Sequence, residues 1–194
     1  MSFRKEIKLK IVNSKIFEFK NYLMEKNFFT QYPDRLVTSI YFDNDKFDMY
    51  KDSIEGSIPR KKIRIRSYES NKKFYIEKKI SSLENRFKIS KTCEDYEKLY
   101  KYGIFDHSYG VCQKKIIVSY LRSYYIFKDF RVTIDKNIEF GKFGKFKNRK
   151  LESSNIVEVK CSTKISNEKI FKMFPFEQVR FSKYAIGVEK FNLA

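Results

Sequence analysis

Basic and aliphatic side chains alternate over residues 62–68, and this alternation is the first pattern in the sequence that could carry chemistry. Ile63 and Ile65 would lie on one side of an extended strand, and Arg64 and Arg66 on the other. A polar turn and a second strand over residues 74–79 would complete a hairpin. A face of packed basic side chains repels itself unless an anion lies over it. A solvated face on a lysine-rich protein explains the same pattern, so the hairpin alone leaves both interpretations open.

Three glutamates stand two residues before a lysine on predicted strands: Glu6, Glu77 and Glu158. Arginine can form two parallel hydrogen bonds with phosphate oxygens, so a basic strand face suits phosphate groups. Carboxylates repel phosphate, but they hold divalent metal ions, which in turn bridge phosphate oxygens. Arginines and glutamates on one face therefore favour metal-assisted binding of a phosphate chain.

The formal net charge of +18 over 194 residues favours a polyanionic partner: nucleic acid, an anionic membrane surface or phosphates. Apolar residues make up 42% of the chain, which is enough for a core, and a single domain over residues 1–194 is expected. The three cysteines, Cys93, Cys112 and Cys161, lack metal-ligand spacing and suit a reducing compartment. Because the N-terminus is charged and no apolar run is long enough for a membrane span, a cytoplasmic protein is expected.

The elements around the hairpin repeat its design, with an aliphatic face and a face that bears Arg or Lys with a carboxylate or tyrosine. Further strands are predicted at residues 4–11, 37–43, 115–127, 130–135 and 156–160, with a basic strand or loop over 81–90. Helices are predicted at residues 13–26, 44–54, 92–102, 166–173 and 182–191. The expected N-caps are Asn13 or Ser14 for the first helix, a capping box from Thr92 for the third, and Ser166 and Ser182 for the last two. Pro33 is expected to end the region of the first helix. The glycine-bearing, basic residues 139–150 are predicted to form a mobile loop.

Two arrangements of these strands satisfy the pattern. A single flat sheet would expose the basic face to water. A closed barrel would turn the basic face inward and leave the aliphatic faces for helices packed outside. Such a lumen would be electrostatically intolerable if dry and empty, but it would suit phosphate.

Eight motifs in a fixed order carry a resemblance that covers nearly the whole chain. They are the segments at residues 4–8, 39–43, 62–68, 76–79, 118–122, 131–135, 157–160 and 181–184. In this order the sequence resembles the VTC domain, the polyphosphate polymerase branch of the triphosphate tunnel metalloenzymes, which also include the CYTH phosphatases. The first strand reads Arg-x-Glu-x-Lys rather than Glu-x-Glu-x-Lys, which favours the VTC side. The resemblance implies an α+β fold with an eight-stranded antiparallel β-barrel, the tunnel, and helices packed outside it.

The resemblance also implies roles for individual residues. The residues matching the family's catalytic positions are Arg64, Arg66, Lys79, Arg122 and Arg131. The residues expected to bind substrate are Lys8, Lys88, Tyr120, Arg180 and Lys183 from the resemblance, and Lys62 and Lys160 from their place on the basic strand faces. The resemblance matches Glu158 to the family's metal-binding glutamate, and the strand pattern adds Glu6 and Glu77 as ligands of the divalent metal, Mn or Mg.

The shared parity of the strand residues predicts that one set converges on a single lumen. The set is Arg4, Glu6, Lys8, Arg64, Arg66, Glu77, Lys79, Arg122, Arg131, Glu158 and Lys160.

The function implied is transfer of the terminal phosphoryl group of ATP to a polyphosphate chain. With water as the acceptor, the same residues would make a triphosphatase for inorganic, nucleoside or RNA 5′ triphosphate. A non-enzymatic polyphosphate-binding module is a third interpretation, but it would not need the three glutamates. The expected partners are ATP or another triphosphate and polyphosphate, with no specific nucleic acid and no membrane span.

Overall fold

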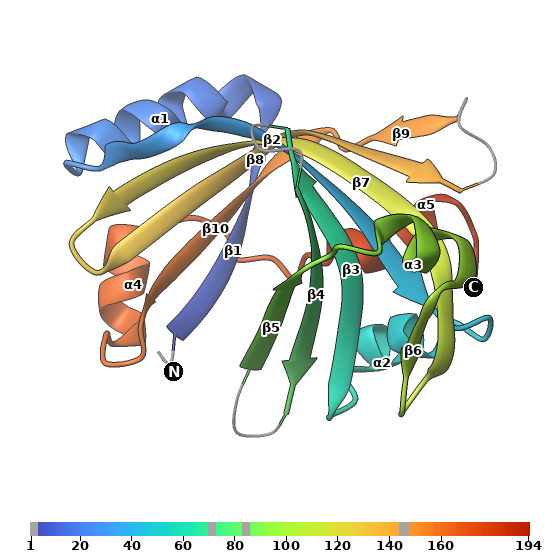
Figure 1. Cartoon of the computed structure of the whole chain (residues 1–194). Helices are drawn as coiled ribbons and strands as arrows, with labels where there is room; N and C mark the ends of the chain where they lie inside the picture. Colours follow the sequence, from blue (N-terminus) through green and yellow to red (C-terminus); the bar gives the residue numbers. More distant parts are fainter. Residues whose placement is uncertain (1–3, 70–72, 83–85, 144–147) are drawn as a thin grey trace. The chain divides into compact units, whose positions relative to one another are not determined.

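The computed structural model describes residues 4–69, 73–82, 86–143 and 148–194, and Figure 1 labels its helices and strands. The chain divides into two compact units. The first unit comprises Met1–Arg35, Tyr120–Ile138 and Glu152–Phe181. The second unit comprises Leu36–Ser119, Glu139–Leu151 and Ser182–Ala194. No helix among the described residues combines the length and apolar character needed to cross a membrane.

The strands pair in the order β1-β10-β8-β7-β2-β3-β4-β5, with β6 added to β7 and β9 added to β8. Their bounds are β1 Arg4–Val12, β2 Phe29–Asp43, β3 Arg60–Tyr68, β4 Phe74–Ser81, β5 Arg86–Thr92, β6 Ile104–Asp106, β7 Gly110–Phe127, β8 Phe130–Lys142, β9 Arg149–Leu151 and β10 Ser154–Ser162. The antiparallel, sheet-rich α+β class is thus confirmed. The paired sheet has two ends, β1 and β5, so closure into a barrel stays a prediction.

The core of the first unit follows from the alternation along β1, β10 and β8. Leu9 pairs with Val157, which pairs with Ile134, so three aliphatic side chains meet on one face. These side chains are fully buried in a cluster that also contains Phe19 and Leu23 of α1 (Ile16–Glu25). Because successive strand residues point to opposite faces, the charged residues between them share the other face.

The helices of the first unit differ from the prediction at one N-terminus and agree at the other. A 3-10 turn, η1 (Asn13–Lys15), precedes α1, so neither Asn13 nor Ser14 caps the helix, and its N-cap, Lys15, makes no side-chain cap bond. In α4 (Asn167–Met173), Ser166 caps as predicted, and its Oγ accepts a hydrogen bond of 3.2 Å from the Lys169 N–H.

The second unit carries α2 (Asp48–Glu55), α3 (Tyr96–Tyr102) and α5 (Lys183–Lys190) with β3, β4 and β5. Ser182 caps α5 as predicted, through a bond of 3.3 Å from the Ala185 N–H. Gly187 lets α5 approach the sheet closely, because a Cβ there would lie 2.7 Å from Cγ2 of Ile116. Helix α3 starts four residues later than predicted, and its N-cap, Asp95, makes no side-chain cap bond.

The strand prediction was wrong at the start of β2, in the segment shared by β8 and β9, and at β6. Strand β2 begins at Phe29 and runs through Pro33, which its mostly exposed first half tolerates because few neighbours need the missing N–H. The predicted loop over 139–150 contains the end of β8 and the start of β9, and residues 144–147 of it lie outside the described residues. The short strand β6 was missed, because three residues cannot display a period.

Candidate functional site

The predicted hairpin forms in the second unit and has the predicted polar face. The strand register determines which polar side chains lie side by side across the strands. Arg64 pairs with Tyr41 on β2 and with Glu77 on β4, and Arg66 pairs with Ser39 and Tyr75. A third row contains Lys62, Lys79 and Lys88 on β3, β4 and β5. The predicted residues of these three strands therefore share one face.

Glu77 lies at the centre of this face and is contacted by three cationic side chains. Its Oε2 lies 2.6 Å from the Arg64 guanidinium and 3.7 Å from that of Arg66, and its Oε1 lies 2.5 Å from Lys88 Nζ. Burial alone would raise the pKa of the Glu77 carboxyl, but the charges of Arg64, Arg66 and Lys88 outweigh burial and lower it to about 2. We call these three basic residues around Glu77 the cationic cluster.

Tyr41 supports the cationic cluster, although sequence reasoning assigned it no role. Arg64 donates a hydrogen bond of 3.1 Å to the Tyr41 hydroxyl, and the Tyr41 ring stacks on that of Tyr184, with centroids 5.4 Å apart. The Tyr184 hydroxyl in turn donates to Asp43 at 2.6 Å. Burial would raise the pKa of the Tyr41 hydroxyl, but Arg64, Arg66 and Lys183 together lower it to about 8.

Replacing Tyr41 by Phe should remove a tyrosine titration step near pH 8. The pKa of the Tyr41 hydroxyl in the folded protein, about 8, lies below the ordinary tyrosine pKa of 10.0. The ionised phenol therefore begins to add stability as pH rises above about 8, and its contribution is complete above about 10. The ultraviolet absorbance of tyrosinate, followed against pH, measures this step. Tyr102→Phe, at an exposed tyrosine, is the control and should keep the step. Identical titration curves for Tyr41→Phe and the wild type would contradict the assignment.

Two further predicted residues in the second unit lie near the start of α5. Lys62 Nζ donates to Ser182 Oγ at 2.8 Å, which ties β3 to the cap of that helix. Lys183 is the first residue of α5, and its charge reaches Tyr41. The strand register and the helix cap thus bring both lysines to the region of Tyr41.

The first unit carries a second polar face, on β1, β10 and β8. Glu6 pairs with Lys160, which pairs with Arg131. In the next row Lys8 pairs with Glu158, which pairs with Thr133. Along the strands, Lys160 Nζ lies 2.6 Å from Glu158 Oε1, and Lys8 Nζ lies 3.8 Å from Glu6 Oε1. Charges of opposite sign therefore alternate on this face.

Arg122 of β7 belongs to the first unit and is held by a carboxylate that sequence reasoning did not assign. Its Nε and one terminal nitrogen contact the two oxygens of Asp135 at 2.5 and 2.8 Å. Burial would lower the pKa of Arg122, but Asp135, Tyr120 and Glu158 raise it. The guanidinium also lies 5.2 Å from the Tyr120 ring centroid. The shared strand parity of Arg131 and Asp135 was the signal that could have found Asp135.

The segment before α5 runs beside β1 and carries Arg180. The Val179 N–H donates to the Lys8 carbonyl at 2.8 Å, and Lys8 Nζ donates to the Phe181 carbonyl at 2.7 Å. Arg180 is exposed between these two anchored residues. This segment therefore fixes the Lys8 side chain as well as the backbone next to Arg180.

The glutamates differ in their fitness as metal ligands. Among the described residues no three His, Cys, Asp or Glu side chains form a group that could hold a metal ion. Glu6 and Glu158 are diagonal neighbours on β1 and β10, and two carboxylates with phosphate and water oxygens are a usual set for Mg²⁺. Glu77 does not fit a metal, because cations contact both of its oxygens.

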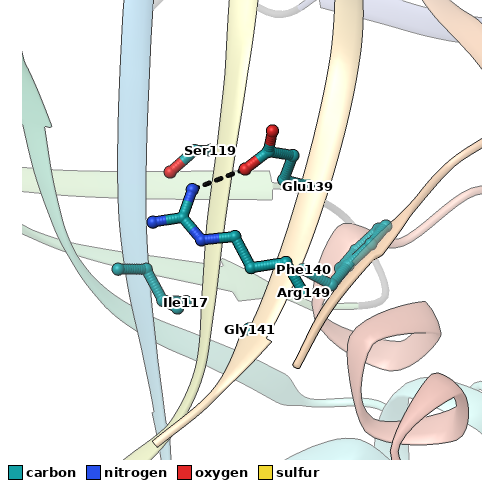
Figure 2. A pocket seen from close by; sticks show the side chains of 6 residues that line it. All are labelled: Ile117, Ser119, Glu139, Phe140, Gly141 and Arg149. Atoms are coloured by element: carbon teal, nitrogen blue, oxygen red, sulfur yellow. Dashed lines mark hydrogen bonds and ion pairs between the residues drawn. The ribbon is translucent and has the colours of Figure 1, made fainter. Parts of the chain in front are cut away.

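A pocket in the second unit lies apart from these predicted positions. Figure 2 shows its six lining residues: Ile117, Ser119, Glu139, Phe140, Gly141 and Arg149. Arg149 donates to Glu139 at 2.5 Å across it. None of the six is a predicted site residue, and the one cation is paired with the one anion. The pocket is therefore not the candidate site.

Solved structures share this fold at low sequence identity. A conserved hypothetical protein from Pyrococcus furiosus is 17% identical, with a TM-score of 0.60 over 94% of this chain and 99% of that chain. A putative adenylate cyclase from Bacillus halodurans is 17% identical, with a TM-score of 0.61 over 97% and 98%. A putative adenylyl cyclase from Hippeastrum, described as having a dominant triphosphatase activity, is 16% identical, with a TM-score of 0.59 over 95% of each chain. These likenesses show the fold alone.

The family comparison covers almost the whole chain. No curated protein matches the sequence. The family model described as the VTC domain matches residues 3–192, which include both polar faces. The chain therefore belongs to the VTC domain family.

Proposed function

We propose that this protein is a metal-dependent enzyme that binds a triphosphate and transfers the terminal phosphoryl group of ATP to a polyphosphate chain. The observation that carries the proposal is the cationic cluster, in which one buried glutamate holds two arginines and a lysine on a single strand face. A cluster built this way is preorganised for an anion, because its side chains are already fixed before the ligand arrives.

The chemistry needs little from the protein beyond positioning and charge. An oxygen of the polyphosphate end forms a bond to the terminal phosphorus of ATP, while the bond from that phosphorus to the ADP oxygen breaks. The acceptor oxygen is already ionised, so no strong general base is required. Arg64, Arg66 and Lys88 would stabilise the charge on the phosphate oxygens, and Lys79 and Lys62 would extend the basic face along the chain.

The carboxylates proposed to hold a divalent metal lie on the polar face of the first unit. Glu158 and Glu6 would hold Mn or Mg, which supplies Lewis-acid stabilisation of the phosphoryl group when bound. Arg131, Lys160 and Lys8 would contact phosphate oxygens on the same face. The remaining roles that the family resemblance implies, for Arg122, Tyr120, Arg180 and Lys183, stay proposals, as does the tunnel itself.

A triphosphatase is the second candidate, and the triphosphatase activity described for the Hippeastrum protein favours it. It would use the same residues with water as the acceptor. Incubating the pure protein with ATP and Mn or Mg separates the two candidates. The polymerase yields polyphosphate and ADP, whereas the hydrolase yields free phosphate without polyphosphate. A non-enzymatic binder yields neither, and it holds polyphosphate equally well when a chelator is present.

Replacing Arg66 by Ala should weaken triphosphate binding by about 2 kcal/mol, roughly thirtyfold, through loss of a charge-assisted contact. Arg66→Lys should recover only part of this loss, since lysine lacks the planar fork. Calorimetric titration with tripolyphosphate measures the affinity, and circular dichroism checks folding, because Arg66 is only 5% exposed. Arg149→Ala is the matched control, since Arg149 is paired with Glu139 outside the cationic cluster. Equal affinity of Arg66→Ala and wild type would count against the proposed site.

A further inference from the structure

A hydroxyl group on the polar face of the first unit has no hydrogen-bond partner. Thr133 pairs with Glu158 on β10, and its neighbours Val132 and Ile134 point into the core, so Thr133 belongs to the polar face. Its Oγ1 is shielded from solvent and bonds to no group among the residues that the structure describes. Buried hydroxyls are nearly always hydrogen-bonded, so this one requires an explanation.

Packing does not require a hydroxyl at position 133. Valine has nearly the same shape as threonine and would fill the position without the cost of burying an unpaired hydroxyl. The strand already uses Val132 and Ile134 on its core face, so the position is suited to a branched side chain. A hydroxyl here costs stability in the free protein, which indicates that its use lies in a bound state.

The charges around Thr133 indicate what that bound partner is. Arg131 lies two residues away on the same face of β8, Lys160 lies on that face of the neighbouring strand β10, and Lys8 lies on it one strand further, on β1. Glu158 is contacted by Lys160 at 2.6 Å. Glu6 and Glu158 share this face with the three cations, and an anionic oxygen held by those cations is an acceptor for a hydroxyl donor.

We propose that Thr133 is a substrate-binding residue whose hydroxyl, shielded in the free protein, turns about χ1 to donate a hydrogen bond to a phosphate oxygen of the bound triphosphate. This inference rests on the proposed function and adds to it a neutral contact that no charge pattern in the sequence predicted. The hydroxyl would orient one phosphate oxygen at a position between Arg131 and Asp135 along β8. Its hydrogen bond is directional, whereas the lysines act as point charges.

Thr133→Val tests the proposal because binding and stability should respond in opposite directions. The valine variant should bind tripolyphosphate about tenfold more weakly in the absence of metal, while the free protein unfolds at an equal or higher temperature than wild type. Thr133→Ser restores the hydroxyl and should return the affinity to within about threefold of wild type. Thr163→Val, the same change at an exposed turn residue beyond β10, is the control and should leave the affinity unchanged.

Other results of these measurements would contradict the proposal. Wild-type affinity in Thr133→Val overturns the proposal, as does a lower unfolding temperature with unchanged affinity, which would mean that the hydroxyl has a partner in the free protein. A loss of affinity seen only with Mg present also overturns it, since the hydroxyl would then act on a metal-bound water. Failure of the wild type itself to bind tripolyphosphate would instead reject the proposed function.

Discussion

Glu77→Gln should destabilise the free protein by about 3 kcal/mol, because it removes the single negative charge shared by buried Arg66, half-buried Arg64 and exposed Lys88. The same magnitude follows from the titration of Glu77. Its pKa falls from 4.5 to about 2, and each pKa unit corresponds to about 1.4 kcal/mol. Glu77, Arg64 and Arg66 are largely shielded, so solvent screens the two arginine pairs little, whereas it screens the pair with exposed Lys88 more. For a domain of this size the loss corresponds to a fall of roughly 6–12 °C in Tm.

The pH dependence gives this prediction a second measurement. Because the folded pKa of Glu77 is depressed, its contribution is fully present above about pH 4.5 and is lost as pH falls toward about 2. The wild type should therefore lose more stability over this range than Glu77→Gln, whose side chain does not titrate. Thermal unfolding of both proteins at pH values across this range measures the difference.

Two comparisons separate this role from that of a metal ligand. Glu168→Gln removes a glutamate from an exposed pair with Lys172 and should cost under about 0.5 kcal/mol. Excess tripolyphosphate should restore part of the stability of Glu77→Gln, since its charge replaces the missing carboxylate. If Glu77→Gln instead unfolded at the wild-type temperature without metal and lost only metal-dependent turnover, Glu77 would be a metal ligand and our interpretation of its contacts would be wrong.

The role of Glu77 illustrates what could and could not be predicted from the sequence. Alternation placed Glu77 on a polar strand face with Arg64 and Arg66, and the register confirms that they share this face. Alternation does not predict, however, how many cations contact Glu77. The metal-ligand prediction for Glu77 came from a carboxylate placed among basic strand residues, whereas Lys88, from the next strand, contacts the second oxygen of Glu77 and completes its set of cations.

Caps and long alternations were predictable because they are local. Ser166 and Ser182 each accept a hydrogen bond from the backbone N–H three residues later, so the cap depends on the local sequence. Both helices begin where the serines predict. Strand β2 was predicted too short because Pro33 resembles a breaker, and only its place in an exposed half-strand explains its tolerance. The Tyr41–Arg64 hydrogen bond and the unpaired Thr133 hydroxyl depend on neighbouring strands, so no local pattern could reveal them.

Glu158→Gln should abolish metal-dependent ATP turnover while leaving metal-free triphosphate binding intact or tighter. Glu158 lies among Lys8, Lys160 and Thr133 on the polar face of the first unit and is 8% exposed. If it only balanced charge, the glutamine variant would raise the positive potential of this face and tighten anion binding without loss of turnover. If it holds the metal, the variant loses the ion and its stabilisation of the transferring phosphoryl group, worth several kcal/mol.

The decisive experiment measures ATP turnover and ATP affinity side by side, with and without Mn, in wild type and Glu158→Gln. Glu152→Gln is the matched control, since Glu152 belongs to the same unit and is paired with Lys10. Turnover of Glu158→Gln within about threefold of wild type, under about 1 kcal/mol, would exclude Glu158 as an essential metal ligand. Glu6 would then remain as the candidate, because both oxygens of Glu77 are held by Arg64, Arg66 and Lys88.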